Sequence, residues 1–173
     1  MSIAKLSRRL FLKSTGAAVG IVTVGSSVLM ASDGAWAMSM MKIDAGAAKT
    51  LIRMARDLYP HDTIDDAVYA KVIEKLDQDA AKDAKLAQML SDGAKALDTA
   101  AGGNYTQASA AKRLKILAAM ESDAFFQKVR GAMVNNFYND PAVWKKLGYQ
   151  GSSAEFGGYL HRGFDDVSWL PKA

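Results

Sequence analysis

The 173-residue sequence contains no cysteine and only two histidines. Without thiols, the chain cannot form disulfides or use a thiol nucleophile, and it cannot hold an iron–sulfur cluster or covalently attached haem. Metal sites usually recruit several histidines, cysteines or clustered carboxylates, and the histidines here are His61 and His161. The strand, glycine-rich turn and helix of a dinucleotide site are missing, as is a serine in a nucleophile elbow. We therefore expect no cofactor-binding, metal or catalytic site in this chain.

Paired arginines lie close to the N-terminus, in the stretch Ser7-Arg8-Arg9-Leu10-Phe11-Leu12-Lys13. The apolar run that follows, residues 14–31, is too short and too weakly hydrophobic for a comfortable membrane span of about 20 residues. Together these features predict a twin-arginine (Tat) export signal, and that pathway moves folded proteins to the periplasm. The pattern Ala35-Trp36-Ala37 predicts cleavage before Met38, with a retained N-terminal anchor as the alternative.

Removal of residues 1–37 changes the charge of the chain. The whole sequence has 22 Lys and Arg against 18 Asp and Glu. The signal contains four of the basic residues and one of the acidic ones, so residues 38–173 carry 18 against 17, a net charge of +1. The basic character thus belongs to the signal, which argues against nucleic-acid binding. Residues 38–173 are expected to form one domain, long enough to bury a core without disulfides.

Apolar residues recur at three- and four-residue spacing through most of residues 44–138, which predicts an all-α bundle of about five helices. The expected helices run from a cap at Asp44 to Tyr59, from Asp62 or Thr63 to Asp79, from Asp83 to Gly102-Gly103, from Ala108 to Met120, and from a cap at Ser122 to Tyr138. Pro60 should end the first helix and the glycine pair the third. Residues 38–43 are expected to be a ragged start of the mature chain.

The last two helices should supply much of the core. In the fourth, the inward residues are expected to be Leu114, Leu117 and Ala118. In the fifth, helical spacing relates a heavier set of apolar residues: Phe125, Phe126, Val129, Met133 and Phe137.

The sequence changes in character from residue 139, where an irregular tail, residues 139–173, begins. Apart from a turn of helix at Ala142–Leu147, it shows no helix or strand period. It is rich in glycine and in aromatic residues: Trp144, Tyr149, Phe156, Tyr159, Phe164 and Trp169. So much aromatic surface must be buried, either over the bundle of the same chain or against another protein.

Two polar stretches have both a structural and a functional interpretation. Tyr59-Pro60-His61-Asp62 is either a tight turn before a capped helix, or a docking element or histidine ligand site. In the stretch Tyr159–Asp166, Arg162 either pins a loop by pairing with Asp165 or Asp166, or belongs to an interface hot spot rich in aromatics. A metal site of two histidines and one carboxylate, built from His61 and His161, is a further alternative.

Several stretches carry a resemblance to a known family. They are Arg56-Asp57-Leu58-Tyr59-Pro60-His61-Asp62, Phe137-Tyr138-Asn139, Trp144-Lys145-Lys146-Leu147-Gly148-Tyr149-Gln150-Gly151, Gly157-Gly158-Tyr159 through Arg162-Gly163-Phe164-Asp165-Asp166, and Trp169-Leu170-Pro171. With these residues the chain resembles the gluconate 2-dehydrogenase subunit 3 family. The resemblance implies a small helical subunit that escorts a large FAD-containing dehydrogenase of the glucose–methanol–choline type through the Tat translocase, often with a cytochrome c. It implies no catalytic residue in this chain.

The leading hypothesis is therefore a non-catalytic accessory subunit of a periplasmic dehydrogenase complex, whose FAD lies in the partner subunit. The partner interface is expected at Tyr59, Pro60, His61, Asp62, Tyr138, Trp144, Tyr149, Gly157, Gly158, Tyr159, Arg162, Phe164, Asp165, Asp166 and Trp169. One alternative is a self-contained periplasmic enzyme or metal-binding protein that uses His61, His161 and nearby carboxylates. Another is a free-standing structural or ligand-binding domain with its tail folded on itself.

Overall fold

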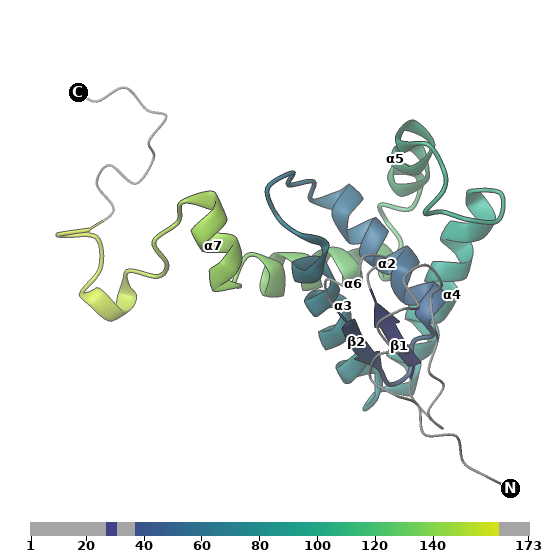
Figure 1. Ribbon diagram of the computed structural model, residues 1–173, viewed down its shortest axis with the longest axis horizontal. Helices are drawn as coiled ribbons and strands as arrows, with labels where there is room; N and C mark the ends of the chain where they lie inside the picture. The colour runs from purple at the N-terminus through teal and green to yellow at the C-terminus, as the bar shows by residue number, and fades with distance from the viewer. Residues whose placement is uncertain (1–26, 31–36, 163–173) are drawn as a thin grey trace, which may run out of the picture.

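The computed structural model describes residues 27–30 and 37–162 (Figure 1). Their elements are β1 (Ser27–Met30), β2 (Ala37–Met40), α2 (Ala45–Leu58), α3 (Asp66–Ala80), α4 (Ala84–Ala100), α5 (Ala110–Ala119), α6 (Ala124–Ala132), the π-helix η1 (Met133–Phe137), α7 (Pro141–Leu147) and the 3-10 helix η2 (Ala154–Phe156). Helix α2 contacts α3, α4, α5 and α6, and so lies at the centre of a bundle. Residues Pro141–Arg162, which we call the arm, project away from it. The predicted all-α class is confirmed.

Aspartates precede most of the described helices, and the sequence pattern predicted two of them, Asp44 and Asp83. Asp44 Oδ1 accepts hydrogen bonds from the first free N–H groups of α2, and Asp83 does the same for α4. The predicted cap Ser122 is wrong by one residue, because the carboxylate of Asp123 accepts the N–H of Phe125 at 2.7 Å. Helix α3 begins later than predicted, because a turn that buries Ile64 precedes it.

The core confirms the predicted apolar face of α6 and η1, since all five of its residues are buried: Phe125, Phe126, Val129, Met133 and Phe137. The prediction for α5 is wrong in two of three positions. Leu117 is buried, but Leu114 is 67% exposed and Ala118 is also exposed. Arg113 takes an inward position instead, because it forms an ion pair with Asp57 of α2.

A glycine in the middle of α4 sets how closely two helices approach. A Cβ at Gly93 would lie 2.3–2.4 Å from the ring of Phe125 on α6. Because no heavy atoms pack that closely, only glycine allows the aromatic ring to lie against the α4 backbone here.

The segment before α2 belongs to the fold, so the prediction of a ragged start at residues 38–43 is wrong. Strand β2 pairs antiparallel with β1, and the side chains of Met38, Met40 and Ile43 are buried in the core. The fully buried carboxylate of Asp77 on α3 accepts the N–H groups of Met41, Lys42 and Ile43, the last at 2.7 Å. One side chain therefore fixes three consecutive backbone groups.

Candidate functional site

Two of the predicted interface segments meet where the arm leaves the bundle. His61 Nε2 lies 2.8 Å from the Tyr138 hydroxyl, and its ring stacks on Phe137 with centroids 5.7 Å apart. Tyr59 packs edge-on against Tyr138 with centroids 5.5 Å apart. Burial raises the pKa of Tyr138, so its hydroxyl stays protonated at neutral pH. These residues, although far apart in sequence, form one cluster.

The loop between α2 and α3 is fixed from the α3 side. The Tyr69 hydroxyl donates to the carbonyl oxygen of Tyr59 at 2.7 Å, and the Arg56 guanidinium lies 5.2 Å from the centroid of the Tyr69 ring. Burial raises the pKa of Tyr69, although Arg56 opposes the shift, so this hydroxyl remains a donor. The neighbouring Pro60 and Asp62 are exposed. The loop is therefore a fixed surface beside the start of the arm.

Trp144 fixes the first turn of the arm. Its indole N–H donates to the carbonyl oxygen of Tyr138, and Tyr149 packs edge-on against its ring with centroids 5.5 Å apart. Asp140 caps α7 through its side chain. Gly151, with φ +89°, lies against the indole, where a Cβ would come within 3.1 Å of the ring. The arm thus begins in a defined orientation relative to the bundle.

Arg162 ties the far end of the arm back to its middle. Its guanidinium donates to the carbonyl oxygens of Gln150 and Ser152, the second at 3.1 Å. It also lies over the ring of Phe156, 4.1 Å from the centroid. The expected pairing of Arg162 with a following aspartate falls outside the described residues. The described contacts fix the loop through backbone carbonyl groups instead.

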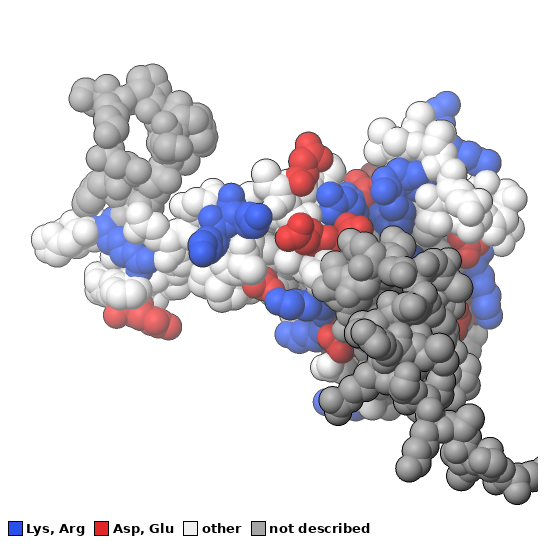
Figure 2. All heavy atoms as spheres, in the orientation of Figure 1, with Lys and Arg blue, Asp and Glu red and all other residues white. Residues whose placement is uncertain are grey.

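The end of the arm exposes large apolar side chains. Phe156, Tyr159 and Leu160 are 68%, 61% and 76% exposed, and Gly157 and Gly158 turn the chain between them at positive φ. Much of the arm surface is uncharged, with basic side chains over α7 and both basic and acidic ones near its far end (Figure 2). The sequence left open whether the tail folds over the bundle of its own chain. Its described part projects from the bundle and does not fold over it (Figure 1).

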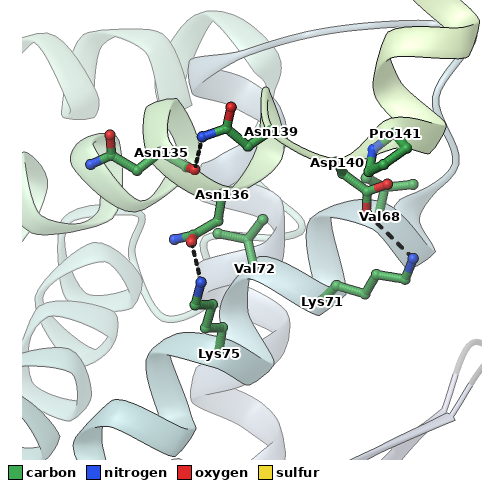
Figure 3. A pocket seen from close by; sticks show the side chains of 9 residues that line it. All are labelled: Val68, Lys71, Val72, Lys75, Asn135, Asn136, Asn139, Asp140 and Pro141. Carbon is green, nitrogen blue, oxygen red and sulfur yellow. Dashed lines mark hydrogen bonds and ion pairs between the residues drawn. The ribbon is translucent and has the colours of Figure 1, made fainter. Parts of the chain in front are cut away.

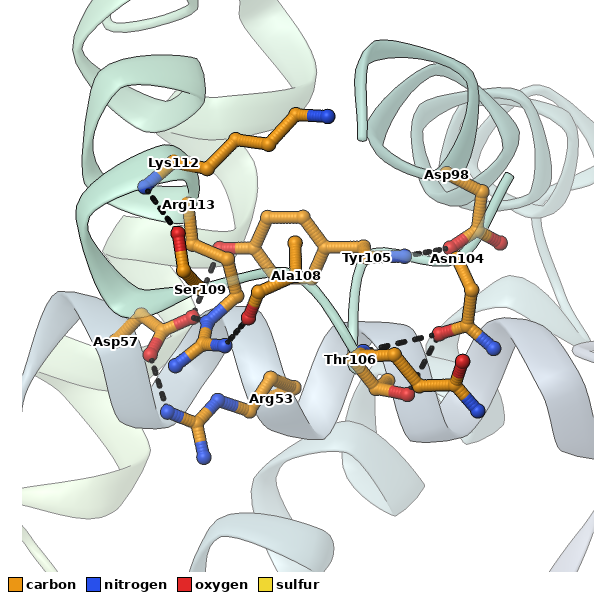
Figure 4. Close-up of polar contacts among 11 residues, drawn as sticks. Arg53, Asp57, Asp98, Asn104, Tyr105, Thr106, Ala108, Ser109, Lys112 and Arg113 are labelled. Carbon is orange, nitrogen blue, oxygen red and sulfur yellow. Dashed lines mark hydrogen bonds and ion pairs between the residues drawn. The ribbon is translucent and has the colours of Figure 1, made fainter. Parts of the chain in front are cut away.

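A second polar cluster, which sequence reasoning missed, joins α2 to α5 (Figure 4). Asp57 accepts from Arg113 Nε at 2.7 Å and from the Tyr105 hydroxyl at 2.9 Å, and it pairs with Arg53 at 2.9 Å. Burial and the Asp57 carboxylate raise the pKa of Tyr105, so the phenol stays a donor. The cluster could have been predicted from Arg113, because it lies four residues before the inward Leu117 and therefore on the same face of α5. Because its members bond to one another, we assign the cluster a structural role.

The two histidines lie in different surroundings. His61 belongs to the cluster with Tyr138, whereas His161 is exposed on the arm. Within residues 27–30 and 37–162, no three His, Asp or Glu side chains gather closely enough to hold a metal ion. The described residues therefore do not form the site of two histidines and a carboxylate that the sequence left open.

Several predicted residues lie outside the described residues: Ser7, Arg8, Arg9, Phe11, Leu12, Lys13 and Ala35 of the signal, and Phe164, Asp165, Asp166 and Trp169 of the tail. The predicted cleavage bond, between Ala37 and Met38, lies within β2, where Ala37 pairs with Met30 and Met38 with Leu29. None of the described helices has the length and apolar character needed to cross a membrane.

Comparison with known proteins identifies a family. A family model described as gluconate 2-dehydrogenase subunit 3 matches residues 45–152, which is more than half of the chain. The matched range contains the bundle helices, α7 and the first part of the arm, and it ends before the exposed tip at Phe156. Neither curated proteins nor solved structures give a significant match.

Proposed function

Because the chain belongs to the gluconate 2-dehydrogenase subunit 3 family, we propose that it is the non-catalytic subunit of a periplasmic dehydrogenase complex. It binds a large FAD-dependent sugar or alcohol dehydrogenase in the cytoplasm and escorts it, folded, through the Tat pathway. The observation that carries this proposal is the arm, which holds large apolar side chains away from a bundle that already has its own core. Exposed apolar patches of this kind mark protein–protein contacts.

The arm is suited to binding because its shape is set before a partner arrives. Trp144 fixes its start to the bundle, and Arg162 ties its far end to the carbonyl oxygens of Gln150 and Ser152. A preformed element loses less conformational entropy on binding than a flexible tail. The aromatic and arginine side chains that the arm presents are those enriched in interface hot spots.

The N-terminal sequence supports the export part of the proposal. Arg8 and Arg9, with Phe11, Leu12 and Lys13, have the pattern of a Tat signal, and that pathway accepts folded proteins. The sequence contains no dinucleotide-binding pattern of its own. A folded cargo that carries FAD would explain why such a chain uses this pathway, and the dehydrogenase is then the main cargo.

Replacing Arg8 and Arg9 by lysine tests the escort role. We expect the periplasmic amount of both this chain and its dehydrogenase to fall at least about tenfold, because one signal serves both proteins. Cell fractionation, with flavin absorbance and dehydrogenase activity in each fraction, measures the outcome. The control variant is Lys5→Arg, which keeps the positive charge at that position and leaves Arg8 and Arg9 unchanged. If the dehydrogenase still reached the periplasm in the Arg8→Lys/Arg9→Lys strain, the escort role would be wrong.

The β1–β2 pairing should slow removal of the signal. A peptidase binds its substrate as an extended segment, and the predicted cleavage bond lies in a strand that β1 already pairs. The N–H groups of adjacent strand residues point to opposite sides, so substituting proline at both Val28 and Leu29 removes the one of these two N–H groups that faces β2. We expect signal peptidase to cleave this variant about tenfold faster than the folded full-length chain, since loss of one backbone hydrogen bond costs about 0.5–1.5 kcal/mol and about 1.4 kcal/mol corresponds to a factor of ten.

The matched control places the two prolines at Val22 and Thr23, upstream of β1. It keeps the number of prolines in the signal but leaves the ladder unchanged. The rate of cleavage is followed by the shift in mass of the purified chain. Equal rates for the two double-proline variants would show that β1 does not protect the bond.

A further inference from the structure

A groove separates α3 from the π-helix η1 beside the start of the arm (Figure 3). Its cavity volume is about 610 Å³, within the range of pockets that hold drug-sized ligands. Lys71 and Lys75 of α3 lie on one side, and Asn135, Asn136 and Asn139 lie on the other. The groove therefore combines two cations with three side-chain amides.

The three side-chain amides, two from η1 and one from Asn139 just after it, have different partners. Asn136 Nδ2 donates to the carbonyl oxygen of Ala132 at 3.1 Å, and Asn139 Nδ2 donates to that of Asn135 at 2.7 Å. Within the described part of the chain, the side-chain amide of Asn135 makes no hydrogen bond, and Asn139 Oδ1 accepts none. An asparagine amide offers the same donor and acceptor as a peptide unit, so it can bind the backbone of an extended segment.

The charges in the groove favour an acidic occupant. Lys71 Nζ lies 3.4 Å from Asp140 Oδ2, whereas the partner of Lys75 Nζ among the described residues is a neutral acceptor, Asn136 Oδ1, at 2.6 Å. The lining residues carry two ammonium groups and one carboxylate, a net charge of +1. A carboxylate placed beside Lys75 would balance this charge.

The groove is continuous with the arm. Asp140, which ends the groove, caps α7, and Pro141 is the first residue of that helix. A segment bound in the groove would therefore leave it along the arm. Short π-helices occur frequently at functional sites, which is consistent with a binding role for η1.

We infer that this groove binds an extended, acidic segment of the large subunit that the arm contacts. Its backbone meets the amides of Asn135 and Asn139, and an Asp or Glu side chain of the segment lies beside Lys75. The identity of the occupant rests on the proposed function, because the segment is taken to come from the dehydrogenase. The arm and the groove then hold the same partner from two directions.

Two synthetic peptides test the chemistry of the groove. One alternates Thr and Glu, and the other alternates Thr and Lys. Each is titrated into the ¹⁵N-labelled full-length chain. We expect the side-chain amide signals of Asn135 and Asn139 to shift when the Thr/Glu peptide is added and not when the Thr/Lys peptide is added. Lys75→Glu should weaken that binding about tenfold, because it places a carboxylate where an ammonium was. Lys128→Glu changes the net charge equally on the exposed surface of α6 and should leave it unchanged.

The same two variants test the source of the segment in the native complex. We expect Lys75→Glu to lower recovery of the co-purifying flavoprotein several-fold and Lys128→Glu to have no effect. If the acidic peptide shifts no groove amide, or if both lysine variants behave alike, the inference is wrong. If the peptide binds but Lys75→Glu leaves the complex intact, the occupant is not the dehydrogenase. Arm variants are measured separately, so partner binding through the arm can stand when the groove inference fails.

Discussion

We expect replacing Phe156, Tyr159 and Leu160 together by serine to weaken binding of the proposed flavoprotein partner at least about a hundredfold. Each of these side chains is more than 60% exposed in the free chain. Burying one large apolar side chain stabilises a complex by about 1.5–3 kcal/mol, and every 1.4 kcal/mol changes the dissociation constant tenfold. Loss of three such contacts at the centre of an interface therefore removes nearly all stable complex. Titration of tagged wild-type and triple-variant chains against the purified flavoprotein measures the change.

Leu114→Ser is the matched control for this experiment. Leu114 is 67% exposed, like the arm residues, but it lies on α5 of the bundle. The triple variant should unfold at the same urea concentration as the wild-type chain, because the substituted side chains contribute nothing to the core. Wild-type affinity in the triple variant, or an equal loss in Leu114→Ser, would show that the exposed tip does not bind the partner.

Local patterns were sufficient to predict most of the helices. Asp44 and Asp83 begin α2 and α4 because a carboxylate that binds the first free N–H groups is a property of a few neighbouring residues. The apolar face from Phe125 to Phe137 was equally visible, because helical spacing places these side chains on one side. Such features depend on residues in neighbouring turns of one helix, which the sequence shows directly.

Contacts between distant segments were not predictable in the same way. Asp57 and Arg113 lie 56 residues apart, and nothing in either local pattern indicates the other. The outward position of Leu114 follows from that pairing, because rotating Arg113 inward turns Leu114 to solvent. Asp77 looked like any charged residue on a helix, yet its partners are backbone groups 34 to 36 residues away. Every residue except proline has a backbone N–H, so the sequence does not show which of these groups a carboxylate binds.

The direction of the arm was not predictable from the sequence for a related reason. Composition alone showed that the aromatic tail needed burial, but it could not choose between the chain's own bundle and another protein. The direction of the arm depends on the indole of Trp144 and its bond to the Tyr138 carbonyl group, which is a tertiary contact. The groove was missed because its two walls, α3 and η1, become neighbours only in the folded chain.

Replacing Asp77 by alanine lowers the free energy of unfolding by about 3 kcal/mol. The buried N–H of Ile43 loses the carboxylate oxygen that accepts it at 2.7 Å. The N–H groups of Met41 and Lys42, which are partly buried, lose their acceptors as well. A buried donor left unpaired costs about 1–3 kcal/mol, while water can reach the two less buried groups. The loss corresponds to a folding constant more than a hundredfold smaller. Urea unfolding of the full-length chain, followed by circular dichroism, measures it.

Two further variants separate the lost hydrogen bonds from other effects of the substitution. Asp79→Ala changes an exposed carboxylate on the same helix and should alter stability by less than about 0.5 kcal/mol. Asp77→Asn keeps one acceptor oxygen but places an amide donor near an N–H, so it should lie between wild type and Asp77→Ala. Hydrogen exchange at residues 41–43 should speed up in Asp77→Ala even in the absence of urea. Equal unfolding midpoints for Asp77→Ala and Asp79→Ala would show that this carboxylate does not hold the N-terminal segment. A lower midpoint for Asp77→Ala alone would instead show that the segment after the predicted cleavage bond is part of the folded domain. The export signal is then attached to this domain through strand β2, which pairs with β1.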